Sequence, residues 1–300
     1  MPIISVCICT YQRPVLLRRL LESLPGLQTN GLFGYEIVVT DNDQAGSGKQ
    51  VVEEFAKGSS LNVTYSVEPR QSISFARNRC VERAKGDFIA FIDDDEFPAK
   101  DWLLRLFETC SRQKVAGVLG PVRPHFDSEP PAWLIRGRFC ERLEHETGFV
   151  MSWPETRTGN VLFDKGIVKG IDPIFRPEFA AASGDQDFFR RMMEKGHRFI
   201  WCNEAVAYEV VPPFRWTRQY LIERALLRGG HSLKVPPPRE RVVIVLKSMV
   251  ALPAYALALP FLLFGGHHRF MKYLVKLCHH AGRLSGVLGM NPVRRRGRLW

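Results

Sequence analysis

The sequence is poor in the features that hold small secreted or zinc-stabilised proteins together. Its 300 residues include seven cysteines, an odd number, and no C-x-x-C pair. This pattern disfavours a disulfide framework and also a zinc ribbon. Unpaired thiols are typical of a reducing compartment, so we expect the body of the protein to lie in the cytoplasm.

We also expect no secretory leader, and the sequence shows no internal repeat and no disordered composition. Its first residues, MPIISVCICTYQRP, have no basic segment before the apolar run and reach Arg13 and Pro14 too early for a signal peptide. We interpret them as a first β-strand. With 45% hydrophobic and 24% charged residues, the chain can bury a sizeable core. One enzyme-sized domain with an appendage is therefore expected.

Acidic residues are almost missing from the C-terminal fifth of the chain. Residues 239–300 contain eleven Lys or Arg and one acid, Glu240, whereas residues 1–238 contain 31 basic and 30 acidic residues. Nearly all of the net charge of +11 therefore belongs to this tail, and it indicates what the tail binds rather than what the body binds. The nearly neutral body offers no basic groove, and a hydrophobic run precedes the basic tail. We expect residues 240–300 to contact a membrane surface, and we expect no nucleic acid partner.

Short β-rich apolar runs alternate with helical patterns from residue 3 to residue 120. This alternation predicts an α/β fold with a parallel sheet covered by helices. Strands are expected at residues 3–9, 35–40, 61–67, 88–92 and 115–119. Residues 121–157 interrupt the rhythm with five prolines and scattered aromatics. Beyond them we expect strands at 160–163, 199–202 and 206–210 and helices at 187–195 and 217–228.

Polar residues follow three of the predicted strands. They are Thr10 and Tyr11 after the first strand, Asp41 and Asn42 after the second, and Asp93, Asp94, Asp95 and Glu96 after the fourth. In an open parallel sheet, ligands bind beyond the carboxyl ends of the strands. Two carboxylates about 4 Å apart repel by roughly 4 kcal/mol at an effective dielectric constant near 20, and a divalent cation removes that repulsion. The acidic run therefore predicts a site for Mg²⁺ or Mn²⁺; the alternative is a solvated acidic turn.

Three other stretches come close to known motifs without matching them. DQAGSGKQ, residues 43–50, lacks the first Gly and the final Ser or Thr of a phosphate loop. PFRW, residues 213–216, lacks the Gln of the Q-x-x-R-W box of processive synthases. DDDEF resembles a phosphatase pattern in which Asp93 would be the nucleophile, although Phe97 departs from it. A phosphatase and a non-catalytic nucleotide- or carbohydrate-binding module remain alternatives.

Six segments in a fixed order resemble the family 2 glycosyltransferases. They are ISVCICTYQRP, EIVVTDND, EPRQSISFARNRCVERAKGDFIAFIDDDEFP, TGNVLF, SGDQDFFRRM and AVAYEVVPPFRWTRQYLIERALLRGG, and they cover about residues 3–230. The resemblance implies a GT-A fold, which is Rossmann-like with a mostly parallel sheet flanked by helices. It implies an enzyme that moves a sugar from a nucleotide diphosphate sugar to an acceptor hydroxyl with inversion, in envelope or exported glycan synthesis.

The resemblance also implies roles for individual residues. Thr10, Tyr11, Arg13 and Asp41 match the base and ribose side of the donor site, and Arg77 and Asn78 match the loop beside it. Asp93 would face the nucleotide sugar, and Asp95 would bind Mg²⁺ or Mn²⁺ together with Asp93. Asp94 would be a spacer or would support the ion indirectly.

The motif that holds the general base in the family 2 glycosyltransferases aligns with the stretch SGDQD of this sequence. Gly184 stands where the family has Glu, which leaves the choice of base open. Ungapped alignment selects Asp185. Asp187 is the alternative, although an acid in the first turn of a helix often only compensates the helix dipole. Asn160 and the aromatic residues Trp133, Phe139, Phe149 and Trp153 are expected to shape the acceptor site.

The hydrophobic run at residues 242–264 is long enough to span a bilayer, because its 23 residues would extend roughly 35 Å as a helix. Lys247, Pro253 and Pro260 interrupt it. A single span would export the eight Lys or Arg of residues 265–300, against the positive-inside rule. We therefore expect a re-entrant or interfacial helical pair, with an amphipathic helix around Phe270 and Tyr273 on anionic lipid.

The expected organisation is thus a GT-A catalytic domain at residues 1–235 and a membrane-associating helical region at 236–300. The enzyme would lie on the cytoplasmic face of the inner membrane, with its catalytic domain in the cytoplasm. Its acceptor would be a glycan or a lipid-linked sugar. A soluble helical subdomain and an oligomer interface are the alternatives for the tail.

Overall fold

The computed structural model describes residues 1–179, 184–233, 236–290 and 293. The chain divides into two compact units. The first comprises Met1–His125, Arg142–Ala180 and Gly184–Val210, and the second comprises Phe126–Glu141 and the chain from Val211 onward. The expectation of a catalytic domain that ends at residue 235 stays a prediction.

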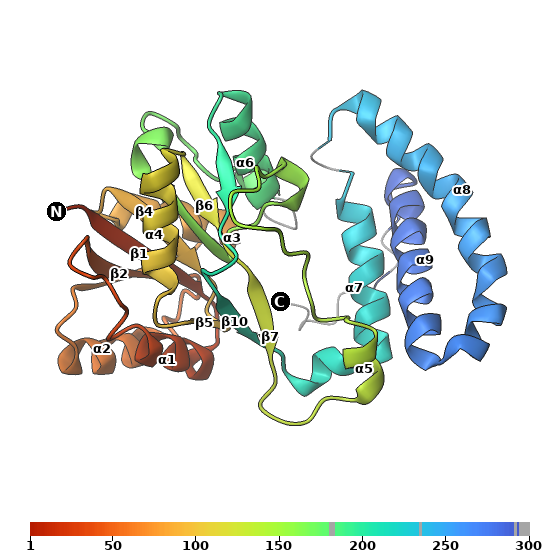
Figure 1. Ribbon diagram of the computed structural model, residues 1–300, viewed down its shortest axis with the longest axis horizontal. Coiled ribbons are helices and arrows are strands. Elements are labelled where there is room, and N and C mark those ends of the chain that lie inside the picture. Colours follow the sequence, from red (N-terminus) through yellow and green to blue (C-terminus); the bar gives the residue numbers. More distant parts are fainter. Residues whose placement is uncertain (180–183, 234–235, 291–292, 294–300) are drawn as a thin grey trace. The chain divides into compact units, whose positions relative to one another are not determined.

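The first unit is built on a seven-stranded sheet with the order β3-β2-β1-β4-β8-β6-β9 (Figure 1). The strands are β1 (Ile3–Thr10), β2 (Gly34–Asp41), β3 (Val63–Val67), β4 (Phe88–Ile92), β6 (Gly117–Leu119), β8 (Asn160–Asp164) and β9 (Phe199–Trp201). All neighbouring pairs are parallel except those of β8, which runs antiparallel to β4 and β6. The mostly parallel sheet and the first five strands are confirmed to within two residues.

Helices cover both faces of this sheet, because successive residues of β1 are buried on opposite sides. Ile4, Val6 and Ile8 pack in one core with α1 (Pro14–Ser23), α2 (Lys49–Gly58) and α4 (Trp102–Gln113). Cys7 packs in the other core with α3 (Ile73–Arg83) and α6 (Gly184–Glu194). Pro14 opens α1 at a position where its missing N–H costs no helical hydrogen bond.

A second, three-stranded sheet has the order β5-β10-β7 and was missed in part by the sequence patterns. Its strands are β5 (Glu96–Pro98), β7 (Val122–His125) and β10 (Ala207–Val210). β5 uses the last residue of the acidic run, and its pairing sets Glu96 opposite Glu209. Phe97 stacks on Tyr208 with ring centroids 5.3 Å apart, which helps to hold this short pairing.

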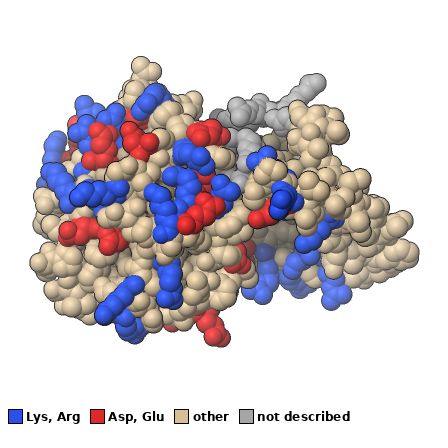
Figure 2. Space-filling view, turned by 90° about the horizontal axis from the view of Figure 1, so that it is seen from above, with Lys and Arg blue, Asp and Glu red and all other residues tan. Residues whose placement is uncertain are grey.

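Short helical turns occupy the segment that the sequence shows as irregular and the connections after it. They are α5 (Ala132–Arg136), η1 (Trp153–Glu155), η2 (Lys165–Val168), η3 (Pro177–Phe179), η4 (Pro213–Trp216) and η5 (Leu263–Gly265). The helix expected at residues 187–195 begins earlier, at Gly184. Asp185 and Asp187 therefore both lie in its first turn. Figure 2 shows acidic and basic side chains interspersed on the surface of the first unit.

The second unit contains α7 (Arg218–His231), α8 (Pro238–Leu262) and α9 (His267–Val287). The backbones of α7 and α9 touch at glycines: a Cβ added to Gly229 would lie 2.1 Å from the His279 carbonyl oxygen, and one added to Gly282 would lie 2.1 Å from that of Leu226. α8 continues through Pro253 and Pro260 as one helix. The hydrophobic run therefore does not form the helical pair expected for it, and α9 covers the segment that was expected as an amphipathic helix around Phe270 and Tyr273.

Candidate functional site

The ends of β1, β2 and β4 bring the predicted polar residues to one edge of the sheet. Thr10 and Asp41 stand opposite each other in the register of β1 and β2, and β4 is the other neighbour of β1. The Thr10 hydroxyl donates to Asp94 Oδ2 at 2.8 Å. Arg13 Nη1 lies 3.0 Å from Asp94 Oδ1 and 3.4 Å from Asp95 Oδ2. Asp94 is thus held by two side chains from the β1 end.

The acids after β4 are buried, which rules out the alternative of a solvated acidic turn. Asp94, Asp95 and Glu96 are only 5%, 8% and 2% exposed. Burial raises the pKa of Asp93 and of Glu96, and it raises the pKa of Asp94 to about 7, because a buried carboxyl group loses the water that favours its charged form. The neighbouring Asp95 charge acts in the same direction on all three.

The same acids leave an oxygen unsatisfied. Glu96 Oε1 is buried and has no hydrogen-bond partner within the described chain. A Cβ added to Gly159 would lie 2.9 Å from this atom and 2.9 Å from Asp93 Oδ2, so only glycine fits between these carboxylates without moving them. An orphaned, buried carboxylate oxygen is costly unless a ligand satisfies it.

The donor atoms of this cluster fit a hard divalent cation. The described residues contain no group of three or more Asp, Glu, His or Cys side chains arranged to hold a metal ion. Mg²⁺ and Mn²⁺ often use only one or two carboxylates and take their remaining oxygens from water and substrate phosphates. The half-buried Asp93 carboxylate and the buried Asp95 carboxylate, with the Glu96 oxygen that lacks a partner among the described residues, are a donor set of that kind.

Asp41, by contrast, is engaged within the protein. Its Oδ2 accepts hydrogen bonds from Gly48 N at 2.6 Å and from the Tyr65 hydroxyl at 3.0 Å, and its Oδ1 accepts from Asp43 N at 3.0 Å. These bonds fix the Gly-rich turn that opens α2. Tyr11 is 39% exposed at the same edge of the sheet.

Arg77 and Asn78 lie on α3 and have different surroundings. The Asn78 side chain exchanges two 2.8 Å hydrogen bonds with the backbone of Phe175, one in each direction. It therefore clamps the segment at residues 174–179. The Arg77 guanidinium lies 5.7 Å from the centre of the Phe175 ring, and its charge partly offsets the rise in the pKa of Asp93.

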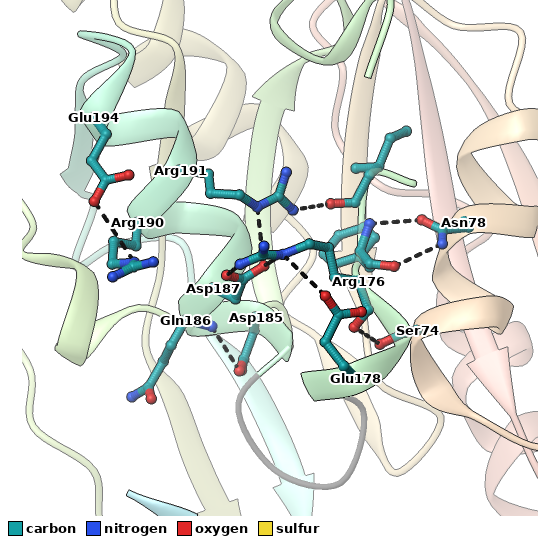
Figure 3. Close-up of polar contacts among 12 residues, drawn as sticks. Ser74, Asn78, Arg176, Glu178, Asp185, Gln186, Asp187, Arg190, Arg191 and Glu194 are labelled. Carbon is teal, nitrogen blue, oxygen red and sulfur yellow. Dashed lines mark hydrogen bonds and ion pairs between the residues drawn. The ribbon is translucent and has the colours of Figure 1, made fainter. Parts of the chain in front are cut away.

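The two acids of α6 differ sharply in their partners (Figure 3). Asp187 is fully buried and accepts from Arg176 Nε at 2.9 Å and from Arg191 Nε at 3.0 Å. Asp185 is half-buried, and among the described residues it accepts one hydrogen bond, from the adjacent Gln186 N–H at 2.9 Å. Asp187 is committed to structure, whereas the second carboxylate oxygen of Asp185 has no hydrogen-bond partner among the described residues.

Three further charged residues of the site were not found from the sequence: Arg142, Arg157 and Glu209. Arg142 forms an ion pair with Glu209, next to Glu96. The charges of Glu96 and Asp185 both act on Arg157. Isolated arginines in an irregular segment show no periodicity that would reveal them. The sequence signal that could have located Arg157 is the stretch TGNVLF, which begins directly after it.

The model of the glycosyl transferase family 2 matches residues 5–167, which is more than half of the chain. The protein belongs to this family. Succinoglycan biosynthesis protein ExoM of Rhizobium meliloti is 31% identical over 301 residues, covering 98% of this chain and 96% of that protein. Glycosyltransferase AglE of Haloferax volcanii is 24% identical over 220 residues, covering 71% and 69%.

The fold is also that of solved glycosyltransferases. The mannosyltransferase PcManGT from Pyrobaculum calidifontis, in complex with GDP-Man and Mn²⁺, matches with a TM-score of 0.65 at 19% identity, covering 97% of this chain and 87% of that one. The expected GT-A fold and family are therefore confirmed. The family makes the protein a glycosyltransferase and disfavours the phosphatase alternative.

Asn160, expected at the acceptor site of this transferase, has a different role. It is fully buried; its Nδ2 donates to the carbonyl oxygens of Pro121 and Ala205, and its Oδ1 accepts from Trp102 Nε1 at 2.7 Å. Because both ends of its amide are satisfied inside the protein, Asn160 ties the strand ends together and is not free for an acceptor.

Among the aromatic residues expected with Asn160, Trp133 and Phe139 belong to the second unit, where they pack beside Leu134.

Proposed function

We propose that the protein is an inverting glycosyltransferase that moves a sugar from a nucleotide diphosphate sugar to an acceptor hydroxyl, in the synthesis of an envelope or exported glycan. The observation that carries this proposal is the contrast at the first unit's site. Among the described residues, a buried acidic cluster at the sheet edge has an oxygen without a hydrogen-bond partner, and Asp185 in the first turn of α6 accepts one hydrogen bond. The first suits a metal-bound diphosphate, and the second suits a general base.

On the donor side, Thr10, Tyr11, Arg13 and Asp41 would surround the nucleoside, with Arg77 beside it. Asp93 and Asp95 would hold Mg²⁺ or Mn²⁺. The bound ion would offset negative charge on the departing diphosphate. Thr10 and Arg13 orient Asp94 within the acidic cluster, so that loading the site need not reorder these side chains. The complex of PcManGT with GDP-Man and Mn²⁺ supports this assignment by analogy.

On the acceptor side, Asp185 would accept the proton of the attacking hydroxyl group. The acceptor oxygen forms its bond to the anomeric carbon as the bond to the diphosphate oxygen breaks on the opposite face, which inverts the configuration. Asp187 is the poorer candidate, because both of its oxygens face arginines.

The tail supports a place at the membrane. Within the described residues, Pro238–Gly265 is the one helix that is long and apolar enough to cross a bilayer, with 28 residues and a mean hydropathy of 2.1. Large apolar side chains are exposed along α8 at Val242, Val243, Leu246, Met249, Val250, Leu257 and Phe261. We infer that residues 236–300 associate with the cytoplasmic face of the inner membrane, where the acceptor would be a glycan or a lipid-linked sugar.

Three measurements test the enzyme assignment. A panel of nucleotide sugars is screened for hydrolysis and transfer with Mg²⁺ or Mn²⁺, and the anomeric configuration of the product is read by NMR. Asp185→Asn should lower turnover by about 10²- to 10⁴-fold and preserve donor binding by calorimetry. Full turnover in Asp185→Asn would refute the base assignment, and metal-independent nucleotide binding that Asp95→Ala leaves unchanged would refute the donor site.

A further inference from the structure

Arg157 differs from the other arginines of this site in its contacts with the described residues. It lies between η1 and β8, is half-buried, and makes no hydrogen bond or ion pair within the part of the chain that the structure describes. The other arginines of the site are engaged: Arg13 with Asp94 and Asp95, Arg142 with Glu209, and Arg77 against the Phe175 ring. A half-buried guanidinium of this kind can bind an anion from outside the chain.

The backbone on both sides of Arg157 is tied to the two halves of the candidate site. Upstream, the Pro154 carbonyl oxygen accepts a 2.8 Å hydrogen bond from Gln186 Nε2, and Gln186 follows Asp185 on α6. Downstream, Gly159 lies against the carboxylates of the acidic run. Arg157 is therefore positioned between the proposed base and the proposed metal ligands.

The residue next to Arg157 also has a buried polar atom without a partner in the described chain. The adjacent Thr158 hydroxyl is 1% exposed and, like Glu96 Oε1, has no partner among the described residues. Burial, and then the charge of Arg142, lower the pKa of Arg157 to about 10, while Asp185 and Glu96 act in the opposite direction. Arg157 therefore carries its full positive charge at pH 7.

In the proposed reaction, the diphosphate of the donor is the negatively charged group that lies beside these acids. We propose that Arg157 binds the diphosphate oxygens of the donor and of the released nucleoside diphosphate. This inference rests on the proposed function and adds a substrate-binding residue to it. A guanidinium offers five donors in a planar fork that matches phosphate oxygens, which a metal ion on Asp93 and Asp95 would leave partly uncovered.

The contact also favours the chemical step. When the bond between the anomeric carbon and the diphosphate oxygen breaks, the electron pair stays on that oxygen and the diphosphate gains one negative charge. A fixed positive charge interacts more strongly with the leaving group than with the intact donor, and such a difference accelerates a reaction.

The test compares a nucleoside diphosphate with its monophosphate. Calorimetry on the full chain with Mn²⁺ first identifies which of UDP, GDP and dTDP the wild type binds best. Arg157→Gln should then weaken binding of that diphosphate by about 10- to 100-fold and change binding of the monophosphate less than about twofold. Arg157→Lys should fall between the two proteins, because it keeps the charge and loses the fork.

Arg112→Gln is the matched control, since Arg112 is exposed on α4. It should bind like the wild type. Wild-type diphosphate affinity in Arg157→Gln would overturn the proposal. Equal losses for the diphosphate and the monophosphate would overturn it too, because they indicate a general structural role.

A second measurement does not depend on the variant folding. Phenylglyoxal modifies arginines in the wild-type chain, and mass spectrometry with and without the diphosphate and Mn²⁺ should show protection of Arg157 and none of Arg112. Unprotected Arg157 would contradict the proposal. A wild type that binds no nucleoside diphosphate would instead contradict the proposed function, so the two failures are distinct.

Discussion

Two groups of acids in the same unit differ in how far the protein compensates their charge. Asp187 on α6 is fully buried, and the guanidinium groups of Arg176 and Arg191 surround it (Figure 3). The acids after β4 are almost as buried, but one Glu96 oxygen has no partner in the described structure and Asp94 has a pKa of about 7. The protein completes the first group itself and leaves the second incomplete.

This difference separates structure from function in a chain rich in acids. A buried charge that the protein compensates fully holds elements together; here Asp187 joins α6 to the segment at 174–179, which Asn78 joins to α3. A buried charge that remains unbalanced costs stability and persists where a ligand completes it. The first group should therefore affect folding when it is altered, and the second should affect binding.

The largest expected effect is on stability, at Asp187. Asp187→Asn leaves the half-buried Arg176 and Arg191 without their buried carboxylate, so the free energy of unfolding should fall by about 3–5 kcal/mol in urea titrations. Glu178→Gln is the matched control, because Glu178 contacts the same Arg176 at 3.8 Å with a side chain that is 59% exposed. Its loss should be below about 1 kcal/mol. Equal losses of stability in the two variants would contradict the distinction between the buried Asp187 and the exposed Glu178.

The next effect is a dependence on pH that comes from Asp94. Burial raises its pKa to about 7 from an ordinary value of about 3.9. Between pH 4 and 7 the folded chain then holds more protons at this group than the unfolded chain, so stability falls as pH rises, by up to roughly 1 kcal/mol per pH unit. Above pH 7 this contribution no longer changes.

Urea titrations at pH 5, 6 and 7 in the presence of a chelator measure the slope. Asp94→Asn should flatten it, although Asp93 and Glu96 contribute in the same direction because burial also raises their pKa. An unchanged slope in Asp94→Asn would mean that the carboxyl group is solvated, contrary to its burial.

The sequence predicted the parts of this site that follow from strand patterns. Apolar runs located β1, β2 and β4, and the polar residues after them met at one edge because parallel strands end on the same side. Which of these acids were compensated could not be predicted. Phe175, the partner of Asn78, and Arg176, one of the two arginines that bind Asp187, lie in the irregular segment at 174–179, which carries no periodic pattern.

The sequence patterns also missed short strand pairings between distant segments, for a related reason. β5 has three residues and exists because Phe97 meets Tyr208, more than 100 positions later in the chain. Neither partner forms a long alternating run, so local pattern gave no sign of the pairing. The same pairing places Glu209 and its partner Arg142 beside the acidic run, which is why these two residues emerged only from the structure.

A smaller effect should appear in binding at Gly159. A Cβ there would displace the tips of the Asp93 and Glu96 side chains, which can rotate, so stability should change little. The displaced oxygens should weaken Mn²⁺-dependent binding of a nucleoside diphosphate by about tenfold in calorimetry of Gly159→Ala. Gly58→Ala is the control, because a Cβ at Gly58 meets no atom within 4 Å. Intact binding in Gly159→Ala would show that these oxygens do not face the ligand.

The smallest expected effect is on the stability of Glu96→Gln, and its size decides whether the acidic cluster is as unbalanced as the structure indicates. Glutamine keeps the shape of the side chain and removes a charge that burial already disfavours, as the raised pKa of Glu96 shows. The free energy of unfolding of the metal-free protein at pH 7 should therefore stay within about 1 kcal/mol of the wild type or rise. A loss as large as that of Asp187→Asn would mean that a compensating cation of the protein lies against Glu96, and the two groups of acids would then be alike.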